Sequence, residues 1–241
     1  MFVHNNYVFA ITLEQVIKLS VLEKMIDDDV HFNGNQLQRE LHKAIQRLPE
    51  KQRIVFRGRE ISYRRYTYVM LNKPEGYVSA TEDTLSPTVL TLLPEELQRI
   101  GLFPCGRLDK HTLGLVMLTD DGDLAHRLLS PKHHVKKKYR FECKFPLTDE
   151  EISYLEKGAT LEDGYITKPS EIELDADKKS GYITLVEGKY HQIKRMIASF
   201  DNKVTFLKRI SFATIPLDGS LASGEWRYLS DEEIALLESF G

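Results

Sequence analysis

The sequence predicts an α+β domain with a mixed, largely antiparallel β-sheet flanked by helices, preceded by a small α/β segment. Strand-like apolar runs are separated by segments with helical spacing, and the two kinds do not alternate strictly as in parallel α/β folds. The length of 241 residues suits one large domain with a small appendage, and 41% apolar residues are enough for a substantial core.

Residues 1–62 are expected to form the small unit. Apolar residues at helical spacing predict a helix over 13–25. The run Val30–Phe32 before Asn33-Gly34 predicts a strand that enters a tight turn. The polar, basic stretch 58–66 is typical of a linker, so the larger domain is expected to cover residues 66–241.

The larger domain carries strand-like and helical patterns in turn. The expected strands are 68–71, 115–119, 138–145, 182–186 and 204–215, and the expected helices are 94–100, 124–129, 149–157 and 191–200. In the last helix Ile193, Met196, Ile197 and Phe200 define an inward face that leaves Lys194 out of the core. Ser230 and Glu233 form a capping-box pattern that predicts a C-terminal helix.

Composition excludes several protein classes. Cys105 and Cys143 are too few for a disulfide framework and lie in no zinc-ligand pattern. The first apolar stretch, residues 7–22, is interrupted by Glu14 and Lys18, so it resembles neither a signal peptide nor a membrane span. We therefore expect a cytoplasmic monomer with no membrane partner.

The net charge of −3 conceals a segregation of charge along the chain. Residues 39–65 hold nine cations and three acids, residues 124–141 hold six cations and no acid, and residues 188–209 hold six cations and one acid. A single such run is usually a solvated face. Three together favour a cationic surface that binds a polyanion, because phosphates neutralised by Lys or Arg release counterions.

Three motifs accompany these basic runs. Asp109 lies in a loop next to Arg107, where an acid is more often structural than catalytic. Tyr139 follows three lysines, so its ring is as well suited to the core as to stacking on a base. The helix expected after Gly188 begins with cations, which the helix dipole disfavours, and this indicates a partner anion.

Taken together, four motifs closely resemble pseudouridine synthases of the RsuA type. They are Asn72-Lys-Pro-Glu-Gly76, Gly106-Arg-Leu-Asp109 with Thr112, Gly114 and Leu115, the strand around Lys137 and Tyr139, and Gly188-x-x-His-Gln-Ile-Lys-Arg-Met196. The resemblance covers about residues 66–238 in family order. It implies the pseudouridine synthase fold and isomerisation of uridine in ribosomal RNA.

The resemblance also implies roles for individual residues. Asp109 matches the catalytic aspartate that attacks the target nucleotide, Tyr139 the ring that stacks on the flipped uracil, and Lys194 the basic partner of the aspartate. A neighbouring cation would keep that carboxylate ionised. The isomerisation involves no redox change or hydrolysis, so no cofactor or metal is expected. RNA contacts are expected from Arg107, Lys73, Lys136, Lys137, Lys138, His191, Gln192 and Arg195.

Two features depart from the family pattern. His111 stands where the family often has an acidic residue. The family commonly begins with an S4-type RNA-binding domain, and here 30–34 and 54–58 resemble its strands and turns, but 24–30 is acidic. We therefore expect a degenerate S4-like domain over 1–62.

The substrate and three alternatives remain open. His191-Gln192 followed by Lys194-Arg195 resembles the small-subunit enzymes, which predicts 16S rRNA, or the assembling small subunit, as partner and a pseudouridine-516 type of activity. The alternatives are a 23S rRNA enzyme of the same superfamily, a non-catalytic rRNA-binding assembly factor, and a glycoside hydrolase. The hydrolase would need a second carboxylate facing Asp109, from Asp120, Asp121 or Asp123.

Overall fold

The computed structural model describes residues 3–4, 7–8, 54–56, 59–61 and 66–240. The chain divides into two units, Met1–Arg65 and Tyr66–Gly241. In the first, β1 (Val3–His4) pairs antiparallel with β2 (Tyr7–Val8), and β3 (Ile54–Phe56) pairs antiparallel with β4 (Arg59–Ile61). The helix expected over 13–25 and the strand expected over 30–32 lie outside the described residues.

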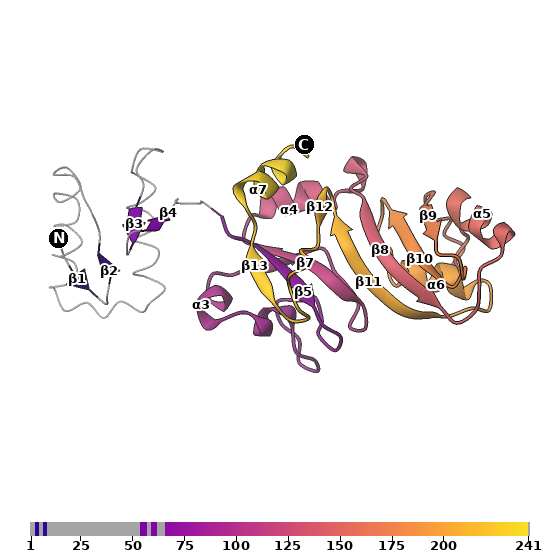
Figure 1. Ribbon diagram of the computed structural model, residues 1–241, viewed down its shortest axis with the longest axis horizontal. Helices are drawn as coiled ribbons and strands as arrows, with labels where there is room; N and C mark the ends of the chain where they lie inside the picture. Colours follow the sequence, from indigo (N-terminus) through magenta and orange to yellow (C-terminus); the bar gives the residue numbers. More distant parts are fainter. Residues whose placement is uncertain (1–2, 5–6, 9–53, 57–58, 62–65, 241) are drawn as a thin grey trace. The chain divides into compact units, whose positions relative to one another are not determined.

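Residues 66–240 form one nine-stranded sheet, in which seven strands follow the order β13-β5-β7-β11-β8-β10-β9 while β6 pairs with β7 and β12 with β11 (Figure 1). Its first part contains β5 (Tyr68–Lys73), β6 (Phe103–Cys105), β7 (Leu113–Thr119) and β13 (Trp226–Tyr228). Its second part contains β8 (Lys137–Cys143), β9 (Glu171–Leu174), β10 (Ser180–Leu185), β11 (Val204–Phe212) and β12 (Ile215–Pro216). All pairings are antiparallel except β7 with β11, which confirms the mixed, largely antiparallel sheet.

The continuous apolar runs of β5 and β7 are explained by burial on both faces. Val69 and Leu71 face one hydrophobic cluster, whereas Tyr68 and Met70 face another on the opposite side. A strand covered on both faces needs no polar alternation. In contrast, apolar and polar residues alternate along β8. Tyr139, Phe141 and Cys143 face the core, and the residues between them face outward.

The helices cover these two clusters. Figure 1 shows α4 (Gly122–Leu129) and α7 (Asp231–Glu238) beside the first part of the sheet, and α5 (Asp149–Lys157) and α6 (Gln192–Ala198) beside the second. The short helix α3 (Glu95–Gln98) and the 3₁₀ turns η1 (Val89–Leu92) and η2 (Pro131–His133) lie in connections. The capping box predicted at Ser230 is present, and Thr148 forms a second one. None of the helices within the described residues is long and apolar enough to cross a bilayer.

The structure corrects the single strand expected over 204–215. β11 ends at Phe212, and Ala213, with a φ of +53°, turns the chain back into the short strand β12. A left-handed Ala carries no sequence signal, because this conformation is usually taken by Gly or Asn. Strands β6, β9 and β13 were not expected, since each has four residues or fewer.

The two parts of the sheet meet where β7 and β11 run parallel over only two residue pairs, Leu113 with Lys208 and Gly114 with Arg209. Gly114 has a φ of +98°, and a Cβ built there would lie 2.2 Å from the carbonyl oxygen of Arg209. Any side chain at this position would separate the two backbones. Glycine at 114 is therefore what allows the junction to form.

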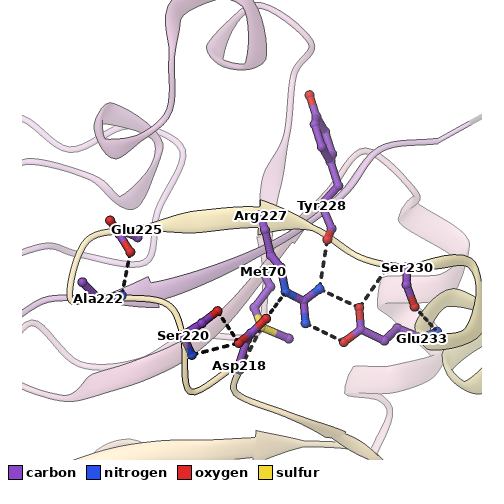
Figure 2. Close-up of polar contacts among 9 residues, drawn as sticks. All are labelled: Met70, Asp218, Ser220, Ala222, Glu225, Arg227, Tyr228, Ser230 and Glu233. Atoms are coloured by element: carbon purple, nitrogen blue, oxygen red, sulfur yellow. Dashed lines mark hydrogen bonds and ion pairs between the residues drawn. The ribbon is translucent and has the colours of Figure 1, made fainter. Parts of the chain in front are cut away.

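A network around Arg227 fixes the C-terminal helix to the sheet (Figure 2). The guanidinium of Arg227 binds both carboxylate oxygens of Glu233 at 2.7 and 2.8 Å, and its Nε donates to Asp218 at 2.6 Å. Asp218 also accepts from the hydroxyl and the backbone N–H of Ser220. These bonds join β13, α7 and the segment before β13, and paired forks of this kind are strong.

We predict that Gly114→Ala lowers the free energy of unfolding by about 3 kcal/mol or more, because the added methyl both clashes with Arg209 and strains a positive φ. Urea unfolding followed by circular dichroism measures this change. The matched control is Gly122→Ala at the start of α4, where a Cβ meets nothing within 4 Å. Equal stability of the two variants would show that the junction tolerates a side chain.

We predict that Arg227→Met lowers the free energy of unfolding by about 1–3 kcal/mol at pH 7. Hydrogen bonds from Ser220 and then from Arg227 lower the pKa of Asp218 to about 2, and Arg227 lowers the pKa of Glu233. A lowered pKa stabilises the fold above the ordinary carboxyl pKa, and this gain disappears as pH falls toward the folded value. The difference between wild type and variant should therefore shrink from about pH 4 to pH 2.

The control for this measurement is Arg99→Met, which removes an exposed pair with Glu95 on α3. Exposed i,i+4 pairs contribute about 0.5 kcal/mol or less. A loss for Arg227→Met that matched the control, or that did not vary with pH, would contradict a stabilising role for the network.

Candidate active site

Asp109 lies in the loop between β6 and β7, immediately before the junction with β11. A turn closes this loop, because the backbone N–H of Thr112 donates to the carbonyl oxygen of Asp109 at 3.0 Å. The Asp109 side chain is 26% exposed. Its carboxylate is thus held at the surface of a rigid sheet, which is the usual position of a reactive group.

The end of β5 and the residues that follow it hold the Asp109 loop in place through hydrogen bonds. The ammonium of Lys73 is fully buried and donates to the carbonyl oxygens of Thr112 at 2.8 Å, Lys110 at 3.2 Å and Pro74. The backbone N–H of Gly76 donates to the carbonyl of Lys110. Burial lowers the pKa of Lys73 to about 8, although the nearby Asp109 acts in the opposite direction. This motif therefore holds the backbone around Asp109.

Three polar side chains converge on the Asp109 carboxylate. Lys194 donates from Nζ to Oδ2 at 2.9 Å, and the hydroxyl of Thr112 donates to the same oxygen at 3.3 Å. Nε2 of His191 lies 3.5 Å from Oδ1. Lys194 and His191 come from the start of α6, 85 residues away for Lys194, so tertiary structure assembles this cluster.

A buried carboxylate organises the chain that enters α6. Glu187 accepts from the hydroxyl of Tyr165 at 2.7 Å, the backbone N–H of Lys168 at 2.9 Å and the side-chain amide of Gln192 at 2.8 Å. The amide oxygen of Gln192 in turn accepts from the backbone N–H of Lys189. These bonds fix the turn that presents His191 and Lys194 to Asp109.

Asp109 borders a pocket with apolar walls and a cationic rim. Tyr139, Leu108, Leu185, Ile193 and Leu207 line it, and Tyr139 is 8% exposed. The charged and polar lining residues include Arg107, which is exposed, together with Glu187, Lys189 and His191. Apolar side chains of this kind can pack against the faces of a flat ring, and the cations beside them attract anionic groups.

The structure brings together Asp109, Tyr139, Lys194, Arg107 and His191, all of which were singled out from the sequence. Within residues 66–240, Tyr139 and Asp109 line the same pocket and no hydrogen bond joins them. The roles of these residues stay predictions at this point. Their common location is the arrangement that those roles require.

Two residues expected to contact RNA are buried instead. Lys73 lies under the Asp109 loop with no exposed surface, so its ammonium is not available to a phosphate. Gln192 is 4% exposed, and both ends of its amide are engaged by Glu187 and Lys189. Both residues support the site from within the protein rather than facing a ligand.

The lysines at the start of β8 and immediately before it were also expected to contact RNA, but each has a partner within the protein. Lys136 pairs with Glu171 at 2.7 Å and Lys138 with Glu173 at 2.8 Å, both on the outer face of the sheet. Lys137 points the other way: its Nζ donates to the carbonyl of Val135, and burial lowers its pKa to about 8. This basic run therefore does not form one free cationic patch.

Arg195 is likewise held by carboxylates within the chain. Its side chain is 16% exposed and binds Glu162 and Asp163, each at 2.6 Å. The hydrogen bond from Arg195 is the main reason that the pKa of Asp163 is lowered. An RNA phosphate would have to compete with these two acids for Arg195.

The glycoside hydrolase alternative fails on geometry. Asp120 and Asp121 follow the end of β7 opposite to Asp109, about 20 Å along the strand. Asp120 accepts from the backbone N–H of Thr67, and Asp121 caps α4 and accepts from Tyr68. Asp123 lies in the first turn of α4, at the same end of β7. None of the three faces Asp109.

Sequence reasoning missed three supporting groups. Glu187 precedes the Gly188 motif, and Ser79 both donates to and accepts from the backbone of Leu108 at 3.1 Å. His111, which departs from the family pattern, lies 2.8 Å from Glu75 at the exposed edge of the loop. For Glu187 the one available signal in the sequence was an acid placed directly before the Gly188 turn. Its burial, which requires hydrogen-bond partners, is seen only in the structure.

Comparison with known proteins identifies relatives over most of the chain. Residues 67–199 match the family described as RNA pseudouridylate synthase. A Bacillus subtilis (strain 168) protein described as uncharacterized RNA pseudouridine synthase YtzG is 47% identical over 192 residues, which cover 78% of this chain and 80% of that protein. Ribosomal small subunit pseudouridine synthase A of Yersinia pestis is 37% identical over 222 residues, covering 92% and 84%. The Escherichia coli (strain K12) protein of that name is 44% identical over 169 residues, covering 70% and 72%.

A solved structure supports the same relationship. A crystal structure of a pseudouridylate synthase superposes with a TM-score of 0.68 at 33% identity, covering 90% of this chain and 98% of that one. The region matched by the family contains Asp109, Tyr139 and Lys194. The chain therefore belongs to the RNA pseudouridylate synthase family, and within it to the RsuA type.

Proposed function

We propose that this enzyme isomerises one uridine of 16S ribosomal RNA, of the pseudouridine-516 type, with Asp109 as the catalytic residue. The proposal depends above all on the carboxylate of Asp109, which is bonded to Lys194 at 2.9 Å and borders a pocket walled by Tyr139. This reaction needs a nucleophile beside a space that can hold a planar base.

The reaction begins when the target base leaves the RNA stack and enters the pocket. Unstacking costs a few kcal/mol, which stacking against an aromatic ring and contacts with phosphates can offset. Tyr139 offers the ring, and Arg107 and Lys189 offer cations at the rim.

Asp109 then attacks the target nucleotide and the C1′–N1 bond breaks. The freed uracil rotates within the pocket, and C5 forms a bond to C1′. The proton on C5 is lost and N1 gains one, so the product is an isomer of the substrate. Tyr139 is the pocket residue suited to assist that proton removal, because its phenol belongs to the pocket wall.

Lys194 has two parts in this scheme. Its ammonium places a positive charge beside the Asp109 carboxylate, and its hydrogen bond fixes Oδ2 so that the other oxygen, Oδ1, attacks the nucleotide. His191, 3.5 Å from Oδ1, borders that reactive side. Thr112 shares Oδ2 with Lys194 and reinforces the orientation.

Small-subunit rRNA as substrate is supported by the relatives from Yersinia pestis and Escherichia coli, which are named for it. The His-Gln-x-Lys-Arg pattern that begins at His191 favours the same assignment. A 23S rRNA target and a purely binding assembly factor are the competing outcomes. An expected S4-like domain over 1–62 would add basic contacts from 39–65.

The first prediction is that Asp109→Asn abolishes pseudouridine formation, with kcat lower by at least about 10³-fold, because an amide is not a nucleophile. Pseudouridines in 16S and 23S rRNA are mapped in a strain lacking the gene and in strains that carry either version. One 16S site should disappear without the gene and return only with wild type.

Each other outcome of this experiment contradicts a specific part of the proposal. Loss of a 23S site would replace the substrate. No missing site, together with salt-dependent RNA binding, would favour the assembly factor. Full activity of Asp109→Asn would refute the catalytic role, and urea unfolding must show wild-type stability before a loss of activity is assigned to the missing carboxylate.

The second prediction is that Lys194→Gln lowers kcat by about 10- to 1000-fold while KM changes by less than about 3-fold, because the ammonium acts on Asp109 rather than on the RNA. Lys194→Arg should recover part of kcat by restoring the charge. Steady-state release of tritium from C5-labelled uridine in transcribed rRNA measures both constants. A variant with raised KM and normal kcat would make Lys194 an RNA-binding residue.

A further inference from the structure

Tyr190 is the most exposed aromatic side chain of residues 66–240, with 76% of its surface open to solvent. A tyrosine ring offers a flat apolar face on which another ring can stack. Tyr190 precedes α6 and follows Lys189, which lines the pocket. Its neighbours Lys189 and His191 both line the pocket, so Tyr190 lies close to it.

One face of this ring is already fixed. The rings of Tyr190 and His191 stack with centroids 3.9 Å apart and an interplanar angle of 16°. His191 has a left-handed backbone, with φ of +49°, and this conformation allows two consecutive rings to lie face to face. His191 in turn lies 3.5 Å from Asp109. The stack therefore extends outward from the reactive carboxylate.

The backbone that carries Tyr190 is held on both sides. Its carbonyl oxygen accepts a hydrogen bond from Arg195, and the N–H of Lys189 donates to the buried Gln192. The ammonium of Lys189 is itself packed over the ring of Tyr165 at 4.3 Å. A ring fixed in this way loses little freedom when a flat ligand stacks on it.

We propose that the outer face of Tyr190 binds the nucleobase adjacent to the flipped uridine. This inference rests on the proposed function. When the target base leaves its stack, each neighbouring base loses a stacking partner. The ring of Tyr190, stacked on His191 beside Asp109, replaces that partner, and the cations Lys189 and Arg107 line the adjoining pocket. Tyr190 is thus a determinant of substrate positioning.

The experiment uses the full-length enzyme and an RNA hairpin that carries the mapped 16S target in its loop. Tyr190→Ala should raise KM and the Kd for this hairpin by about 5- to 150-fold, which corresponds to the stacking of one base. Turnover at saturation should change by less than about 2-fold. Tyr190→Phe and Tyr190→Trp should remain near wild type, because both keep the aromatic face.

The matched control is Tyr228→Ala, which removes another exposed tyrosine, 52% exposed, from β13 in the other part of the sheet. This variant should leave KM and Kd unchanged. If Tyr190 merely supported His191, its loss would lower kcat instead and leave Kd unaltered, and that result would overturn the proposal.

Two modified hairpins, each with an abasic residue on one side of the target, give the decisive measurement. With one of them the Kd ratio between Tyr190→Ala and wild type should fall to about 1, because the base that stacks on Tyr190 is missing. An undiminished ratio with both hairpins would refute base stacking. Turnover of the unmodified hairpin by the wild-type enzyme separately tests the proposed function, because the Kd ratios are measured without turnover.

Discussion

The active site depends on the approach of two backbones at Gly114 and Arg209. Because β7 and β11 pair there over two residues, the loop that carries Asp109 lies next to the connection that carries α6. The Arg209 side chain strengthens this junction, donating from Nε to the carbonyl of Leu115 at 2.7 Å and packing against Phe212. One backbone contact thus joins the two parts of the sheet and brings Lys194 within reach of Asp109.

The distribution of charge shows how a chain with excess acid can retain a cationic binding site. Acids on β9 neutralise Lys136 and Lys138, and Glu162 and Asp163 neutralise Arg195. Arg107 and Lys189 are the cations that line the pocket, and Lys194 faces the carboxylate of Asp109. Such focusing directs phosphates toward one entrance, whereas a uniformly basic surface would bind RNA in many orientations.

Much of the fold and the site could be predicted from sequence because the relevant signals are local. Periodicity identified β5, β7, β8, β10 and four helices, and Ser230 marked the start of α7. The short strands β9 and β13 escaped, since a strand of three or four residues at an edge has no distinctive pattern. The Asp109 motif stood out through family resemblance rather than through physics, because one acid in a loop has many possible roles.

The sequence by itself determined where most of the longer helices and strands lie, which loop holds Asp109 and which family the chain resembles. Only the tertiary structure decided that Lys73 is buried beneath the Asp109 loop, that Lys136 faces Glu171 and that Lys194 binds Asp109. The physical reason is distance along the chain. Propensity, caps and turns act over a few residues, whereas the partner of a charge is chosen by strand pairing between segments that can be 35 to 85 residues apart.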